Sequence, residues 1–450
     1  MTFSSATVSA SVRGARGSER RDAGRHVPSM RFRVVSLGCP KNLVESEYLT
    51  GKLCAAGHTL GDDGDTIIIN TCAFIAEAAR ESIETILEAA RDEEKRVVVT
   101  GCLVERYRED LPKLLPEVGA FVGRAYYNEI DRIIGTRGYY HREGTFAETF
   151  PRQVLTKPPT AYLKIQEGCD NRCHYCTIPA IRGGLTSRTR DDILEEFRWL
   201  LGEGYREINV IGQDITAYGK DRGDKEGLVG LIGSLLRQKG DYHVRLLYMH
   251  PKGVTEKLIE LMGSDRRIIP YLDIPIQHSE DRILTLMGRG HTKAYLEESL
   301  SMMRRRMPEA VLRTSIIVGF PTETDEEFDA LLSFVHRHQF DMLGAFMYAR
   351  EEGTVAYKLK GQIKKSIKRD RYNRLMEAQK EISRTRLTRL FGKTVKIIVE
   401  DTEASPKAGR MLTQAPDIDG IAFLNGECRA GDICEGKVVK TLDYDVVVEV

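Results

Sequence analysis

The first part of the chain contains three short runs of apolar, mostly β-branched residues at regular intervals, at residues 33–38, 66–71 and 96–101. They lack polar alternation, which is typical of strands buried on both faces of a parallel sheet. A helical pattern follows each run, for example at residues 76–90. Strands that alternate with helices predict a small doubly wound α/β domain over residues 31–150.

Six further strand-like runs follow, with helical patterns between them, at residues 161–166, 207–212, 243–249, 269–276, 311–319 and 342–348. Six β/α units are fewer than the eight that close a TIM barrel. They predict a splayed partial (β/α)6 barrel over residues 155–390, separated from the first domain by a Pro-containing link at residues 157–159. A basic amphipathic helix at residues 364–390 is expected to pack onto this barrel.

The last part of the chain, residues 391–450, has short alternating runs at 394–399, 408–413, 420–425, 432–440 and 444–449. This pattern predicts a five-stranded β-barrel. From Lys393 to Val450 there are seven Lys and Arg against eleven Asp and Glu. An RNA-binding surface needs basic and aromatic side chains, so direct RNA binding is not favoured. A basic protein suits this acidic barrel better.

Composition narrows the class of protein further. Hydrophobic residues make up 41% of the chain and charged residues 30%, as in ordinary globular proteins, and no apolar stretch has the length that a membrane span needs. Disulfide frameworks belong to small secreted domains, so an odd set of nine cysteines favours a reducing, cytoplasmic location. Residues 1–30 contain few large apolar side chains and predict a disordered tail.

Three cysteines in one loop, Cys169, Cys173 and Cys176, form a C-x3-C-x2-C run after the strand at 161–166. Thiolates this close together in sequence are metal ligands more often than structural cysteines. Zinc would need a fourth thiolate or imidazole, and His174 is the candidate within the loop. An iron–sulfur cluster takes four ligands, so three cysteines would leave one iron open to a substrate or cofactor.

A second set of cysteines, Cys39, Cys72 and Cys102, follows the three strands of the first domain. Because the carboxyl ends of parallel strands share one edge of a sheet, where ligands bind, these thiols should converge. They predict a second iron–sulfur cluster; the alternative is three small buried residues. Cys54, in a predicted helix, has no such partner and is expected in the core.

Polar residues that follow Cys39, namely Asn42, Glu45 and Glu47, could line the same edge of the sheet. Capping of the following helix would explain them equally well. The sequence leaves both interpretations open.

With these motifs the chain resembles the radical S-adenosylmethionine (SAM) methylthiotransferases. The C-x3-C-x2-C run is similar to the radical-SAM signature, and residues 36–47 (SLGCPKNLVESE), 70–75 (NTCAFI) and 100–102 (TGC) are similar to the amino-terminal domain of that family. The resemblance runs from about residue 32 to the carboxyl terminus, where the small barrel resembles a TRAM domain. It implies two 4Fe-4S clusters, one on each set of three cysteines, with SAM on the open iron of the second set.

The resemblance also implies which residues bind SAM. Tyr175 matches the aromatic contact that the family makes to adenine, and Gly212 and Gln213 lie in the stretch that approaches the SAM amino group. Ile316 and Gly319 end the fifth strand of the barrel, where a glycine would let the backbone approach the adenosine closely.

Two arginines after the cysteine loop, Arg182 and Arg188, are candidate partners for the carboxylate of SAM. A guanidinium group suits a carboxylate because it can donate two parallel hydrogen bonds. Ordinary surface positions are the alternative for both.

Two branches of the family differ in substrate: one modifies an adenosine in tRNA, the other an aspartate in small-subunit ribosomal protein twelve. Residues 39–43 (CPKNL), 70–75, 212–214 (GQD) and 273–278 (DIPIQH) are similar to the second branch, and the acidic barrel agrees with it. A tRNA adenosine methylthiotransferase is the alternative enzyme. A zinc- and RNA-binding protein is the alternative that is not an enzyme.

The activity implied by the resemblance begins with cleavage of SAM at the second cysteine set, which gives a carbon radical. That radical takes a hydrogen from the aspartate β-carbon, and the cluster on the first set delivers a methylthio group made with a second SAM. Such an enzyme needs an electron donor, for example a small flavoprotein or a ferredoxin.

Overall fold

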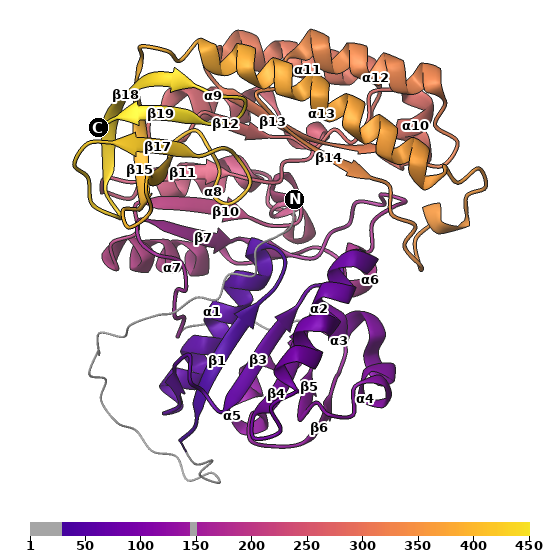
Figure 1. The fold of residues 1–450 in the computed structure, drawn as a ribbon, viewed down its shortest axis with the longest axis vertical. Coiled ribbons are helices and arrows are strands. Elements are labelled where there is room, and N and C mark those ends of the chain that lie inside the picture. The colour runs from indigo at the N-terminus through magenta and orange to yellow at the C-terminus, as the bar shows by residue number, and fades with distance from the viewer. Residues whose placement is uncertain (1–28, 145–150) are drawn as a thin grey trace. The chain divides into compact units, whose positions relative to one another are not determined.

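The computed structural model describes residues 29–144 and 151–450. These residues form two compact units (Figure 1). One contains the chain up to Thr156 together with Thr177–Gly184, and the other contains Lys157–Cys176 and Leu185–Val450. Most of the tail expected at residues 1–30 lies outside the described residues.

A parallel sheet of six strands forms the centre of the first unit, in the order β2-β1-β3-β4-β5-β6. The strands are β1 (Arg31–Ser36), β2 (Thr59–Leu60), β3 (Thr66–Thr71), β4 (Arg96–Gly101), β5 (Ala120–Val122) and β6 (Gly138–Tyr140). The three predicted strands are β1, β3 and β4, which confirms the doubly wound fold. The additional strands have two or three residues each, too few to show a hydrophobic pattern.

Helices connect these strands: α1 (Pro40–Ala55), α2 (Ala76–Ala89), α3 (Cys102–Tyr107), α4 (Leu111–Leu114), α5 (Ile130–Ile133) and, after the cysteine loop, α6 (Ile178–Arg182). From β1 the chain goes to β2 on one side and then to β3 on the other. The boundary between β1 and β3 is therefore a topological switch point, beside which ligands bind in such sheets. α6 packs against α3.

All six strands predicted for the partial barrel are present in the second unit: β7 (Thr160–Lys164), β10 (Glu207–Ile211), β11 (His243–Leu246), β12 (Tyr271–Asp273), β13 (Val311–Val318) and β14 (Met342–Met347). They form two parallel sheets, β11-β10-β7 and β12-β13-β14. An isolated bridge between Val244 and Ile268 lies between these two sheets. The strands therefore follow one another as an open arc rather than a closed barrel.

Helices α7 (Arg190–Gly202), α8 (Gly227–Leu236), α9 (Glu256–Ser264), α10 (Asp281–Leu286), α11 (Lys293–Arg306) and α12 (Asp325–His338) alternate with these strands. Threonine begins four of them, because its hydroxyl accepts an N–H of the first turn that has no partner within the helix. These N-caps are Thr189, Thr255, Thr292 and Thr324.

A long helix, α13 (Lys365–Thr388), packs against β14 and α12, as the basic amphipathic pattern predicted. After it comes a closed barrel of five strands: β15 (Thr394–Asp401), β16 (Lys407–Met411), β17 (Ala422–Asn425), β18 (Ile433–Thr441) and β19 (Val446–Glu449). The predicted five-stranded barrel is thus confirmed. Its core is apolar, with Ile397, Val438 and Val448 fully buried.

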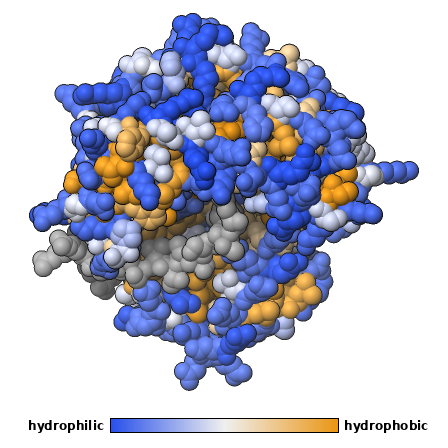
Figure 2. Space-filling model, turned by 45° about the horizontal axis from the view of Figure 1, so that its top comes forward, coloured by the Kyte–Doolittle hydropathy of each residue, from blue (hydrophilic) through white to orange (hydrophobic). Residues whose placement is uncertain are grey.

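Apolar side chains on the surface are scattered. The face in Figure 2 is mainly hydrophilic, with separate hydrophobic patches. Within the described part of the chain, no helix combines the length and the apolar character needed to cross a membrane.

Candidate functional site

The three cysteines of the first unit stand at the carboxyl ends of neighbouring strands. Cys39 is the N-cap of α1, just after β1, Cys72 follows β3 directly, and Cys102 follows β4 as the first residue of α3. Since β1, β3 and β4 are adjacent and parallel, all three lie along one edge, next to the topological switch point. All three are free cysteines, and Cys102 is buried.

Glycines directly before two of these cysteines allow the close approach. Gly38 has φ +87°, and a Cβ there would lie 2.8 Å from Cys72 Sγ. Gly101 has φ +89°, and a Cβ there would lie 2.3 Å from Asn70 Oδ1. A side chain at either position would be strained in the backbone and would collide with its neighbours. The glycines before Cys39 and Cys102 therefore allow the tight turns that bring these cysteines to the edge of the sheet.

Electrostatics agree with this convergence. Burial, and then the neighbouring thiols of Cys102 and Cys39, raise the pKa of Cys72 to about 12. Burial likewise raises the pKa of Cys102, against the opposing effect of Arg182. The three sulfur atoms are thus close enough to repel one another as thiolates. A cation or metal cluster is the kind of group that relieves such repulsion, so these residues fit an iron–sulfur cluster.

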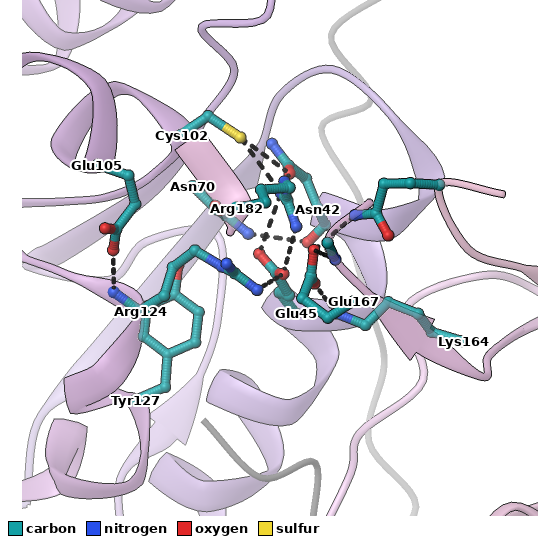
Figure 3. Close-up of polar contacts among 12 residues, drawn as sticks. Asn42, Glu45, Asn70, Cys102, Glu105, Arg124, Tyr127, Lys164, Glu167 and Arg182 are labelled. Carbon is teal, nitrogen blue, oxygen red and sulfur yellow. Dashed lines mark hydrogen bonds and ion pairs between the residues drawn. The ribbon is translucent and has the colours of Figure 1, made fainter. Parts of the chain in front are cut away.

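A guanidinium group lies against this cysteine set (Figure 3). Arg182 Nη2 donates to Cys102 Sγ at 3.2 Å and also to Asn42 Oδ1, while Nη1 donates to Glu45 Oε1 at 2.8 Å. The sequence suggested Arg182 as a partner for the SAM carboxylate. In the structure its bonds go to the first cysteine set.

The polar residues after Cys39 have different roles. Asn42 and Glu45 are fully buried and reach Arg182, so they line the cysteine edge. Glu47 instead accepts hydrogen bonds from Arg152 and from the backbone of Leu155, which fixes the end of this unit. A helix cap does not explain them, because α1 has no side-chain cap bond.

Sequence reasoning missed a second arginine at this site. Arg124 donates from Nη2 to Glu45 Oε1 at 3.1 Å, and both side chains are buried. Its backbone N–H donates to Glu105. Arg124 lies far from Glu45 in sequence, and no local pattern marks it as part of the cysteine site.

The second set, Cys169, Cys173 and Cys176, lies in a loop that follows the short strand β8 (Gln166–Glu167). All three are free and partly exposed. Arg289 donates from Nη1 to Cys173 Sγ at 3.4 Å and from Nη2 to Pro275 O at 2.7 Å. A buried guanidinium therefore bonds to a cysteine here as well. Sequence reasoning also missed Arg289.

His174, the candidate fourth ligand for zinc, is held elsewhere. Its Nδ1 donates to Leu286 O at 2.8 Å, and its ring lies close to Gly288. Across residues 29–144 and 151–450, no three His, Cys, Asp or Glu side chains are grouped so that they could hold a single metal ion.

Two of the residues expected to contact adenosine, Tyr175 and Gly319, come together beside this loop. Tyr175 packs onto a buried cluster formed by Ile283, Met287, Phe320, Tyr348 and Ala356. Phe320 directly follows Gly319, which has φ +70°. Ile316, the third expected contact, is fully buried in β13 and is not part of this cluster; its neighbour Ile317 packs against the cluster instead. Tyr175 and the Gly319 turn thus lie on one apolar cluster, which suits an aromatic base.

A carboxylate that sequence reasoning missed holds the Gly319 turn. Glu323 Oε2 accepts the backbone N–H groups of Gly319 and Phe320 at 2.8 and 3.1 Å. Glu323 Oε1 accepts a bond from Arg371 at 2.8 Å. The turn is therefore fixed before any ligand arrives.

Gln213 presents an unused acceptor at the end of β10. Its Nε2 donates to Glu167 Oε1 at 2.5 Å, and its Oε1 is buried without a hydrogen-bond partner among the described residues. Gly212, beside it, allows close packing, since a Cβ there would lie 2.7 Å from Gln166 Cγ. A buried oxygen without a partner can accept a hydrogen bond from an ammonium group, so this position fits the amino group of SAM.

The guanidinium of Arg188 bonds to other groups of the protein. Its Nη1 donates to Lys164 O at 2.8 Å and pairs with Glu196, which is fully buried. These bonds place the arginine at the junction of β7 and α7, where it ties two elements of the arc together.

Comparison with known families divides the chain into three matches. Residues 31–123 match the uncharacterized protein family UPF0004, residues 163–335 match the radical SAM superfamily, and residues 391–450 match the TRAM domain.

Relatives along nearly the whole chain are ribosomal protein uS12 methylthiotransferases, RimO. The protein from Geobacter sulfurreducens is 43% identical, over 93% of this chain and 98% of the relative. The Thermotoga maritima protein is 42% identical, with 93% and 99% covered, and the Aquifex aeolicus protein is 41% identical, with 93% and 96% covered. These names favour neither tRNA modification nor a protein without enzymatic activity.

Solved structures show the same fold at low identity. The radical SAM methyltransferase TsrM from Kitasatospora setae, with cobalamin and a 4Fe-4S cluster bound, has a TM-score of 0.54 at 15% identity, covering 73% of this chain and 77% of that one. Its complex with tryptophan and a SAM analogue has a TM-score of 0.52, also at 15% identity, covering 70% and 73%. The solved structures support the fold, and the relatives at 41–43% identity show that the chain belongs to the ribosomal protein uS12 methylthiotransferase family of radical SAM enzymes.

Proposed function

We propose that this protein methylthiolates the β-carbon of an aspartate in ribosomal protein uS12. One observation carries the proposal: a single chain has two sets of three free cysteines, one at the carboxyl ends of three neighbouring parallel strands and the other in the loop that follows β7 and β8. One such set would suit many radical SAM enzymes, whereas sulfur insertion calls for a second metal centre.

The residues that would hold the metal centres are Cys39, Cys72 and Cys102 for one 4Fe-4S cluster, and Cys169, Cys173 and Cys176 for the other. When bound, the second cluster supplies the electron for SAM cleavage and the first supplies the sulfur for transfer. The proposed source of electrons is a small flavoprotein or a ferredoxin, in the cytoplasm.

The chain itself would orient SAM. The Oε1 of Gln213 would accept a hydrogen bond from the amino group of SAM. Glu167 would hold the Gln213 amide in that orientation. Tyr175 would contact the adenine, and the Gly319 turn, fixed by Glu323, would leave room for the adenosine beside Ile316. For Arg188 we propose a positioning role through Lys164 and Glu196 rather than a direct bond to SAM.

Domain boundaries at residues 31–150, 155–390 and 391–450 remain part of this proposal. Because the carboxyl-terminal barrel is acidic, we propose that it faces the basic protein substrate. Direct RNA binding is not part of the proposed function.

Iron and sulfide content of anaerobically reconstituted protein tests the assignment of the cysteines. We expect about eight irons in the wild type and about four in each of Cys72→Ala and Cys173→Ala. Cys54→Ala, which removes a free cysteine of α1 outside both sets, is the matched control and should keep about eight. Four irons in the wild type, unchanged by Cys72→Ala, would remove the sulfur-donor role.

Substrate class is tested by incubating the reconstituted enzyme with SAM, reductant, and either uS12 or bulk tRNA. We expect mass spectrometry to find one added methylthio group on an aspartate of uS12. Modification of adenosine in tRNA, with uS12 unchanged, would instead identify the other branch of the family.

A further inference from the structure

Two arginines share one carboxylate in the first unit. Arg182 and Arg124 donate to the same oxygen of Glu45, at 2.8 and 3.1 Å, and each guanidinium side chain is 2% exposed. Arg182 also donates to Cys102 Sγ, at 3.2 Å. Figure 3 shows the guanidinium of Arg124 pointing to Glu45 while Arg182 bonds to Cys102. Both arginines thus bond to the carboxylate of Glu45, but of the two Arg182 is the one that bonds to the sulfur of Cys102.

Arg182 is clamped in its orientation. The Nδ2 of Asn42 donates to the carbonyl oxygens of Leu37 and Thr71, each at 2.9 Å. Carbonyl oxygens can only accept, so the amide of Asn42 must turn its Oδ1 toward Arg182. Asn42 and Glu45 thus hold the guanidinium on two sides, with an N–H directed to the sulfur. These contacts hold the guanidinium of Arg182 in the orientation that its bond to Cys102 Sγ requires.

A donor fixed on a cysteine sulfur affects the metal centre that this cysteine would ligate. Hydrogen bonds to ligand sulfurs and nearby positive charge stabilise the more negative, reduced form of an iron–sulfur cluster. Arg182 supplies both, and Arg124 compensates the charge of Glu45. The net charge beside Cys102 from these three side chains is therefore positive.

We propose that Arg182 raises the reduction potential of the cluster held by Cys39, Cys72 and Cys102. This inference rests on the proposed function, because it takes these cysteines as ligands. Arg182 is a positioning residue in this role: it acts on the cluster through Cys102. Arg124 supports Glu45 and has no direct effect on the sulfur.

The test uses full-length protein in which Cys169, Cys173 and Cys176 are replaced by Ala, so that iron binds at the first set alone. This parent, its Arg182→Gln variant and its matched Arg124→Gln variant are reconstituted anaerobically and titrated with reductant, with EPR as the readout. We expect Arg182→Gln to disfavour one-electron reduction about tenfold, which is a potential about 59 mV more negative. Arg124→Gln removes one positive charge but no hydrogen bond to the sulfur, so it should shift the potential in the same direction by clearly less.

An unchanged potential in Arg182→Gln would overturn the inference. Equal shifts in both variants would also overturn it, because loss of a partner of Glu45 would then be the cause. If Arg182→Gln fails to retain about four irons, Arg182→Lys replaces it; this variant keeps a charge but loses the fork of donors, and it too must titrate below the parent. A parent that binds no iron would overturn the cluster assignment itself, and the inference with it.

Discussion

The guanidinium of Arg410, in strand β16 of the carboxyl-terminal barrel, forms a buried two-pronged ion pair with the carboxylate of Glu207 in β10. Arg245 of β11 donates to the same carboxylate at 2.8 Å and to the carbonyl oxygen of Gln414 at 2.9 Å. The acidic barrel is therefore docked on the partial barrel by a buried polar network rather than tethered by α13 alone.

Acid should weaken this docking. Burial by itself would raise the pKa of Glu207, but Arg410 and Arg245 outweigh it and lower the pKa to about 2. A depressed carboxyl pKa contributes stability that is complete above its unfolded value, near 4.3, and is lost as the pH falls toward 2. From this shift we expect about 3 kcal/mol of unfolding free energy to disappear over that range. Denaturant titrations at several pH values would measure it.

Glu207→Gln should flatten this acid dependence, whereas Glu256→Gln, at an exposed ion pair of α9, should leave it as in the wild type. Parallel curves for wild type and Glu207→Gln would contradict the assignment.

Loss of Arg410 should be costly. Arg410→Met leaves a buried carboxylate with one fewer partner, and breaking a buried pair in this way typically costs about 3–5 kcal/mol. Arg384→Met is the matched control, because Arg384 also joins the barrel to α13, through Asp443, but at the exposed surface. Thermal or denaturant unfolding should show a large loss for Arg410→Met and a small one for the control. Equal losses would mean that burial of the pair does not determine its strength.

The sulfur bond of Arg289 should matter for SAM cleavage. Arg289→Gln removes a charge-assisted donor from Cys173, and a hydrogen bond of this kind is worth about 1.5–3 kcal/mol. We expect formation of 5′-deoxyadenosine to fall at least about tenfold, together with a lower fraction of reduced cluster by EPR in a Cys72→Ala background. Arg306→Gln, at an exposed pair on α11, serves as the control. Wild-type cleavage by Arg289→Gln would show that the bond has no role.

The Gly319 turn should not tolerate a side chain. A Cβ at Gly319 would lie 2.4 Å from Lys368 Cγ, whereas Gly204, which also has positive φ, has nothing within 4 Å of the same position. Gly204→Ala therefore isolates the backbone strain. We expect Gly319→Ala to lose about 1–3 kcal/mol more than Gly204→Ala and to bind SAM more weakly, which calorimetry on the reconstituted enzyme would measure. Similar stability and affinity for both variants would place SAM away from this turn.

Sequence patterning predicted the repeating elements well, because buried strands and amphipathic helices each have a local signature. All six strands of the partial barrel and all five of the small barrel are present, as are the three strands that precede Cys39, Cys72 and Cys102. The short strands β2, β5 and β6 were missed because two or three residues pair by virtue of their neighbours in the sheet.

Site residues divide in the same way. Cysteines at strand ends and in a tight loop can be recognised locally, and the parallel topology brings the first set to one edge. The arginines that bond to those cysteines cannot be recognised from local sequence. Arg182 follows the second set in sequence, yet its contacts are with Cys102 of the first set. Arg289 reaches Cys173 from a segment more than a hundred residues away.

By itself, the sequence determined the fold class, the two cysteine sets and the family, since each depends on periodicity or on residues close together in the chain. Only the tertiary structure decided which charged side chains are buried together. Arg182 with Glu45, and Arg410 with Glu207, are pairs of this kind. A buried charge is stable only where the packing supplies its partner, and that partner is chosen by how distant strands and helices meet.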